Sequence, residues 1–126
     1  MKTLITWLKA MRASFFLASI VPVLVGACLA ARENIYSWDA LVYALIIVMS
    51  SHAGANMLND YYDALGSDAI NRNVTPFSGG SRLIQNGILS RNSYLHGSLV
   101  AFGMALILAV ILTLARWNFY ILGLTI

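Results

Sequence analysis

Three long apolar runs, separated by short polar segments, dominate the pattern of hydrophobic and polar residues along this chain. Counted between charged residues, the runs hold 19, 20 and 24 residues. A helix rises about 1.5 Å per residue and needs about 20 apolar residues to cross the hydrocarbon core of a bilayer. The pattern therefore predicts three membrane-spanning helices, over about 13–31, 40–59 and 93–115.

A fourth apolar run, WNFYILGLTI, begins at Trp117 and continues to the last residue. Ten residues are too few to cross a bilayer as a helix. We therefore expect three complete spans and the start of a fourth, in a chain that is the N-terminal part of a longer protein. No internal repeat or low-complexity linker divides residues 1–126. The expected fold class is an all-α, multi-pass transmembrane helical bundle.

Composition supports the assignment to the membrane. Hydrophobic residues make up 60% of the chain and charged residues 10%, whereas soluble domains are typically about 45–50% apolar. An integral membrane protein is therefore the expected class rather than a soluble globular domain.

Lysine and arginine are distributed unevenly between the two sides of the expected spans, and cytoplasmic flanks collect these residues. The first side has six basic residues and the second has two: Lys2, Lys9, Arg12, Arg72, Arg82 and Arg91 against Arg32 and Arg116. We therefore expect a plasma-membrane protein with a cytoplasmic N-terminus and a cytoplasmic loop over 60–91. The net charge of +3 follows from this bias and does not indicate a nucleic-acid partner.

The first apolar run also fits a different interpretation. Basic residues precede an apolar core that reaches VGAC at 25–28, and this pattern resembles a secretory leader with a lipoprotein cleavage site. A retained span is favoured, because further spans follow and one of them carries a polar cluster at its expected cytoplasmic end. Cys28 then lies in the membrane as a small apolar residue, and a single cysteine cannot form an internal disulfide.

A polar and acidic stretch, NMLNDYYDALGSD, occupies 56–68 at the end of the second apolar run. At about 100° per residue, five polar residues of the expected helix share an arc of about 100°: His52, Asn56, Asn59, Asp60 and Asp63. We expect Gly66 to end the helix, since glycine is common just after a helix C-terminus. The pattern predicts a polar stripe at the cytoplasmic end of the second span.

Aspartates in this position are costly unless they meet water and a cation. An aspartate at mid-membrane costs about 2.5–3.5 kcal/mol, and clustered carboxylates repel one another. Mg²⁺ prefers oxygen ligands and is commonly shared between one or two carboxylates and substrate phosphates. We therefore interpret the stretch as a diphosphate site in which Asp60 and Asp63 face one water-filled hollow. The alternative is an ordinary solvated helix end, and His52 is expected to make a hydrogen bond rather than bind metal.

The next segment, 67–90, offers groups that suit a phosphate. Gly79 and Gly80 permit a tight turn whose backbone N–H groups face an anion, and Arg72 and Arg82 carry planar guanidinium groups. Each feature also has an ordinary explanation, as a surface turn or as part of the charge bias of cytoplasmic loops.

Two smaller elements are expected in the same segment. LIQNGIL, over 83–89, is expected to form a short interfacial helix, because its apolar residues suit the membrane surface. Ser90 or Ser93 is expected to cap the third span, since serine favours helix N-termini.

The acidic stretch and its neighbours resemble a family of membrane enzymes. NDYYDALGSD, 59–68, is similar to the first aspartate-rich motif of the UbiA superfamily of aromatic prenyltransferases. WLKAMRASFFLASIVPVLVG, 7–26, is similar to the start of the first helix of that superfamily. TPFSGGSRLIQNGILS, 75–90, most resembles the loop of the branch that includes 1,4-dihydroxy-2-naphthoate polyprenyltransferase of menaquinone synthesis.

The resemblance implies roles for particular residues. The Asn-Asp-Asp spacing of the family motif carries over to Asn59, Asp63 and, one residue beyond the strict spacing, Asp68, with Asp60 at the adjacent acidic position. Asp60 and Asp63 are the implied catalytic residues. The implied ligands of Mg²⁺ are Asn59, Asp60, Asp63 and Asp68. The implied substrate-binding residues are Asn56, Asn59, Arg72, Ser81 and Arg82.

The chain departs from the family pattern in two places. Ser67 stands where strict spacing puts the last carboxylate, and Arg-Ala-Ser stands at 12–14 where many members have Arg-Pro-Lys. The ligand role of Asp68 and any role of Arg12 are therefore the least secure parts of the resemblance.

The function implied by the resemblance is transfer of an isoprenyl group from a polyprenyl diphosphate to an aromatic acceptor in quinone synthesis, most closely menaquinone synthesis. The family fold has about nine membrane helices, and a second aspartate-rich motif binds a further Mg²⁺. This chain ends before that motif, so we expect the remainder of the enzyme as a partner and no activity from residues 1–126 alone.

Two other functions compete with this interpretation. A small non-enzymatic membrane protein could use the same acidic face to bind a cation without chemistry. CDP-alcohol phosphotransferases also use membrane aspartates and Mg²⁺, but they need a DG-x-x-AR core, which this chain lacks.

Overall fold

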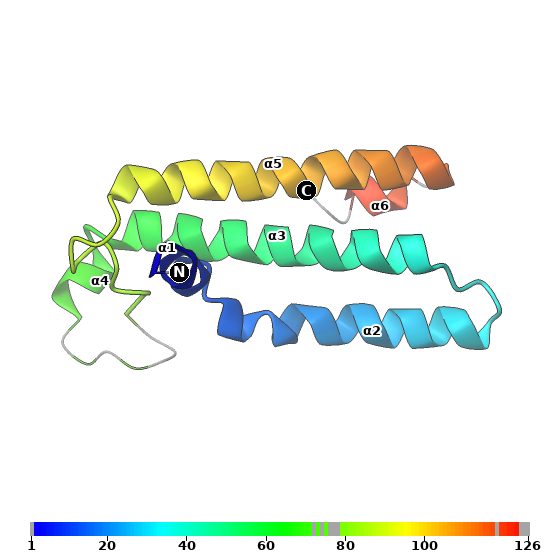
Figure 1. Ribbon diagram of the computed structural model, residues 1–126, viewed down its shortest axis with the longest axis horizontal. Coiled ribbons are helices and arrows are strands. Elements are labelled where there is room, and N and C mark those ends of the chain that lie inside the picture. The colour runs from blue at the N-terminus through cyan, green and yellow to red at the C-terminus, as the bar shows by residue number, and fades with distance from the viewer. Residues whose placement is uncertain (1, 72, 74, 76–78, 118, 124–126) are drawn as a thin grey trace. The chain divides into compact units, whose positions relative to one another are not determined.

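The computed structural model describes residues 2–71, 73, 75, 79–117 and 119–123. The regular elements in these residues are all helices (Figure 1). In chain order they are α1 (Lys2–Ala10), the 3₁₀ turn η1 (Ala13–Phe15), α2 (Leu17–Arg32), α3 (Trp38–Asp63), α4 (Ser67–Ile70), α5 (Arg91–Arg116) and α6 (Tyr120–Gly123). The predicted all-α class is confirmed.

The predicted spans correspond to three long helical segments. By length and composition, Ala13–Arg32, Trp38–Asp63 and Arg91–Arg116 are long and apolar enough to cross a membrane. Many of their large apolar side chains are exposed, as in Leu17 of α2 and Ile107 of α5. Such faces suit a lipid solvent, in which apolar side chains point outward. Of the apolar run after Trp117, the structure describes one helical turn, α6.

The hydropathy pattern did not indicate α1. This helix ends at Ala10, and the chain turns at Met11 and Arg12 before η1 begins at Ala13. Arg12 has a φ of 51°, in the left-handed region that non-glycine residues rarely adopt. The turn therefore separates α1 from the first span within two residues.

Two compact units divide the chain. The first comprises Met1–Ala13 and Ala53–Val100, and the second comprises Ser14–His52 and Ala101–Ile126. Both α3 and α5 contribute one part to each unit. The implied site residues that the structure describes belong to the first unit.

The second unit has a core of small and branched residues. Ile47 of α3 is buried with Ala105, Ala109 and Leu112 of α5, and Tyr43 packs against this group. Alanine at these positions lets two helix backbones approach closely, which favours helix association in lipid. In the same unit Ser19 and His52 form a hydrogen bond of 2.7 Å between Oγ and Nδ1. His52 thus makes the side-chain hydrogen bond that was expected of it.

Two expectations about the polar connection are wrong, and one is confirmed. Gly66 does not close α3, because α3 ends at Asp63 and Gly66, with φ of −112°, instead precedes α4. Residues 83–89 form a series of turns rather than a helix, and Gly87 has a φ of 67° that interrupts helical geometry. Ser90 does cap α5, since its Oγ accepts the Ser93 N–H at 3.0 Å.

Candidate functional site

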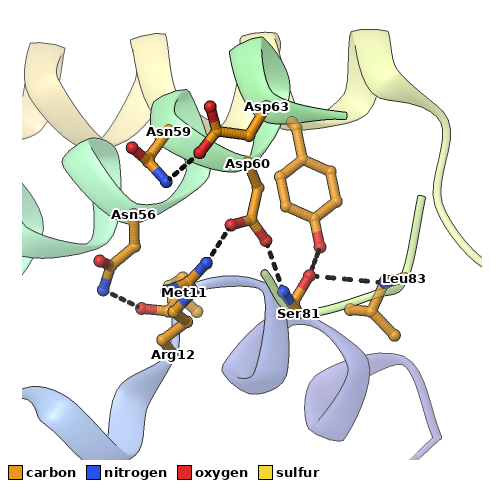
Figure 2. Close-up of polar contacts among 9 residues, drawn as sticks. Met11, Arg12, Asn56, Asn59, Asp60, Asp63, Ser81 and Leu83 are labelled. Carbon is orange, nitrogen blue, oxygen red and sulfur yellow. Dashed lines mark hydrogen bonds and ion pairs between the residues drawn. The ribbon is translucent and has the colours of Figure 1, made fainter. Parts of the chain in front are cut away.

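Asp60 lies in the last turns of α3 and is almost fully buried. One oxygen of its carboxylate, Oδ1, is 2.5 Å from Nη2 of Arg12, and the side chain is 3% exposed. The other oxygen, Oδ2, accepts the backbone N–H of Ser81 at 2.9 Å (Figure 2). Burying a carboxylate is tolerated when it is paired and hydrogen-bonded. Arg12, which follows α1, and Ser81, in the loop before α5, therefore both contact Asp60.

Ser81 and Tyr94 extend this network. The hydroxyl of Ser81 is 2.5 Å from the hydroxyl of Tyr94, which is completely buried near the start of α5. Ser81 thus contacts α3 through its backbone and α5 through its side chain. A second link between these helices comes from Arg91, whose Nε donates to the Tyr61 carbonyl at 2.8 Å while the guanidinium lies 3.8 Å from the centroid of the Tyr61 ring.

Beside the buried pair is a hollow of about 320 Å³. Most of its lining residues carry oxygen-bearing or charged side chains: Arg12, Asn59, Asp63, Ser67, Asp68 and Asn71, with Gly79 and Gly80 completing the wall. Asn59 donates through Nδ2 to Oδ2 of Asp63 at 2.9 Å. Because the amide donates through nitrogen, its carbonyl oxygen keeps its capacity to accept or to bind a cation.

Asp68 approaches the hollow from the one-turn helix α4. Its residue is 5% exposed, and the Gly80 backbone passes so close that a Cβ at position 80 would collide with Oδ2 of Asp68. Gly79 and Gly80 have φ values of 88° and 70°, which glycine adopts at little cost. The guanidinium of Arg82 donates to the Asp68 backbone carbonyl at 2.5 Å. The absence of a side chain at Gly80 is what lets the loop pack against two carboxylates, those of Asp68 and Asp60.

The surroundings of Asp68 disfavour its ionised form. Burial raises the pKa of the Asp68 carboxyl above its usual value, and the nearby charges of Asp60 and Asp63 raise it further. The positive charges of Arg12 and Arg82 act in the opposite direction. A cation beside Asp68 would lower this pKa, because it stabilises the carboxylate.

The charges around the hollow favour a cation, because they leave a small negative balance. Asp60, Asp63 and Asp68 supply three negative charges, and Arg12 and Arg82 supply two positive charges, for a balance of −1. In the part of the chain that the structure describes, no three His, Cys, Asp or Glu side chains gather closely enough to hold a metal. The residues that line the hollow instead offer the carboxylate oxygens of Asp63 and Asp68 and the amide oxygen of Asn59. Such hard oxygen donors fit Mg²⁺ that shares its remaining positions with water or phosphate.

The structure places the implied site residues in three groups. Asn59, Asp63 and Asp68 line the hollow. Asp60 and Ser81 bond to each other outside the lining, and Asp60 faces Arg12 rather than the hollow. The others make contacts elsewhere in the unit or cannot be placed: Asn56 donates to the Met11 carbonyl at 2.9 Å, Arg82 donates to the Asp68 carbonyl, and Arg72 lies outside the described residues.

Two important residues were missed or left open by the sequence. A role for Arg12 was left open, and its place as the last basic residue before the first span is the signal that marks it as a helix-end charge. Tyr94 was not singled out at all. Nothing in its sequence context separates it from other aromatic residues near a helix end, because its importance depends on contact with Ser81.

Comparison with protein families, with curated proteins and with solved structures gives no match to this chain.

Proposed function

We propose that the first unit binds a divalent cation together with the diphosphate of an isoprenyl donor. The observation that supports this most directly is the meeting of Asn59, Asp63 and Asp68 in one hollow whose wall includes two glycines. Carboxylate and amide oxygens suit Mg²⁺, and Mg²⁺ commonly joins carboxylates to phosphates. The resemblance to the UbiA superfamily adds the reaction, which is prenyl transfer to an aromatic acceptor in quinone synthesis, most closely menaquinone synthesis.

Different residues of the unit would have different roles in binding the cation and the diphosphate. Asn59, Asp63 and Asp68 would hold Mg²⁺, with Asp60 acting on the site through its bond to Arg12. Bound Mg²⁺ would supply Lewis-acid neutralisation of the diphosphate as the allylic carbon–oxygen bond breaks. Arg12 lines the hollow, and it would place a second positive charge beside the leaving diphosphate. The buried contacts of Asp60 with Arg12 and Ser81 would keep this geometry fixed during the reaction.

Other components of the proposal come from the resemblance and from the charge bias. In the family that the chain resembles, transfer of the prenyl group also needs a second aspartate-rich motif and an acceptor pocket, so the proposal for residues 1–126 is limited to donor binding. The basic residues of the first unit would place the hollow at the cytoplasmic face of the plasma membrane.

Cation binding to the chain in lipid nanodiscs tests this proposal. Mn²⁺, a paramagnetic substitute for Mg²⁺, should bind to the wild-type chain, and inorganic pyrophosphate should increase its affinity. Asp63→Asn should lower Mn²⁺ affinity by about tenfold or more, since even outer-shell metal partners typically contribute that much. The matched control is Asp39→Asn, the same substitution at the exposed end of the same helix, which should leave affinity unchanged.

The outcomes separate the proposed enzyme from its main alternative. Mn²⁺ binding that is lost in Asp63→Asn but indifferent to pyrophosphate would favour a cation-binding membrane protein without transfer chemistry. Equal Mn²⁺ affinity in the wild type and Asp63→Asn would refute the cation site itself.

A further inference from the structure

Helix α1 has one side turned toward the rest of its unit. Ala10 is completely buried, and Trp7 lies against the site of Gly97, where a Cβ would come within 3.0 Å of Cζ3 of the indole. Met57 of α3 borders the same position. This side therefore packs against the last part of α3 and the first part of α5.

The opposite side of α1 is apolar and uncovered. Leu4, Ile5 and Leu8 are 64%, 50% and 42% exposed, and Lys9 is exposed beside them. Positions 4, 5 and 8 fall within about 100° of one another around a helix. A short helix with an uncovered apolar face and a basic edge is typical of segments that lie in the membrane interface.

The direction of α1 fits that location. Figure 1 shows α1 nearly end-on, while α3 and α5 lie in the plane of the picture. Within the first unit, α1 thus runs across the helices that it contacts. Met11 and Arg12 alone separate α1 from Ala13, where the first spanning segment begins. Because α1 crosses the ends of α3 and α5 and is joined to the first spanning segment by only two residues, it is expected to lie along the membrane surface.

We propose that α1 is an interfacial helix whose Leu4, Ile5 and Leu8 insert between lipid acyl chains, while Lys9 binds the phosphate of an anionic phospholipid. A lipid surface is the occupant that the structure favours, because the connection to Ala13 keeps this face at the bilayer and its charge complements an anionic headgroup. The proposal is independent of cation or diphosphate binding in the hollow. The position of α1 also bears on the rest of the unit, since Met11 and Arg12, which follow α1, contact Asn56 and Asp60.

Spin-label accessibility tests the depth of the apolar face. In a Cys28→Ser background, labels are attached through Leu8→Cys and, as a matched aqueous control, through Asn86→Cys, an exposed position in the loop of the same unit. In nanodiscs the label at position 8 should collide readily with dissolved oxygen and poorly with a water-soluble nickel chelate, and the label at position 86 should show the reverse. Equal nickel accessibility at the two positions would overturn the proposal.

Lipid selectivity tests the basic edge, with no divalent cation present. Vesicles that contain phosphatidylglycerol compete for the detergent-solubilised chain, and Lys9→Gln should weaken preference for the anionic lipid by about fivefold, as expected for one basic residue at a membrane surface. Arg32→Gln removes a positive charge from an exposed helix end and should change this preference less. If Lys9→Gln retains the wild-type preference, or Arg32→Gln loses as much, headgroup binding by Lys9 is wrong.

Discussion

Two aspartate–arginine pairs stand near opposite ends of α3, and they differ in burial far more than in distance. In the first unit Asp60 is 2.5 Å from Arg12, and its side chain is 3% exposed. In the second unit Asp39 is 2.7 Å from Arg116, and its side chain is 64% exposed. The exposed pair is also joined by Ser37, which bonds to both partners.

The difference matters because burial, more than contact distance, sets what an ion pair is expected to contribute to stability. Water screens the charges of an exposed pair, so its net contribution to stability is small. A buried carboxylate has lost its hydration and depends on its partners, so removing one of them leaves an uncompensated charge. The loop at Gly80 and Ser81 creates this situation for Asp60 by covering it and donating to it.

The largest expected effect comes from removing Arg12. Arg12→Ala should lower the free energy of unfolding by about 3–5 kcal/mol, the usual cost of breaking a buried pair. Arg116→Ala should change it little. Denaturation of both variants in bicelles by increasing SDS measures the difference. Arg12→Lys should recover part of the loss, because it keeps the charge with fewer donors. Equal destabilisation by the two alanine variants would mean that burial does not distinguish the pairs.

Gly80→Ala should disturb the cover over Asp60 and Asp68. A methyl group at position 80 meets the carboxylate of Asp68 and lies 3.3 Å from Oδ1 of Asp60. Gly87→Ala is the matched control, since Gly87 has a similar positive φ and nothing within 4 Å of its Cβ position. Backbone strain should cost both variants about 1–3 kcal/mol, and the collision should add about 1–3 kcal/mol to Gly80→Ala alone.

The same unfolding assay measures this second comparison. Gly80→Ala should also weaken Mn²⁺ binding, whereas Gly87→Ala should not. Identical stabilities and Mn²⁺ affinities for the two variants would show that the loop backbone can shift without disturbing the carboxylates of Asp60 and Asp68.

A smaller effect is expected from the pH dependence of Asp68. Because the pKa of its carboxyl is raised in the folded protein, the folded state binds this proton more tightly than the unfolded state. Its contribution should therefore favour folding at low pH and decline as pH rises from about 3.8 through the higher folded value. Asp68→Asn should flatten this part of the profile of melting temperature against pH. An unchanged profile in the variant would contradict the assignment to Asp68.

The sequence predicted the helices around the site better than the side-chain contacts within the site. The polar stripe placed Asn59 and Asp63 together correctly, because residues four apart share one face of a helix. It also grouped Asp60 with them, but in the structure Asp60 forms an ion pair with Arg12 instead. Helical geometry gives the direction of a side chain and cannot say which distant residue meets it. The prediction of a helix over 83–89 was wrong for a related reason, since its apolar residues suit a helix while Gly87 adopts a turn conformation.

That the protein is α-helical, with segments able to span a membrane, could be predicted from the amino-acid sequence, because charge-free length and hydropathy are properties of consecutive residues. Packing between distant segments sets which carboxylate pairs with Arg12, that of Asp60, and which carboxylates line the hollow, those of Asp63 and Asp68. Arg12 and Asp60 are 48 positions apart, and Asp68 lies against the backbone of Gly80 in the following loop. Local patterns do not specify such pairings, because they depend on how separate segments pack against one another.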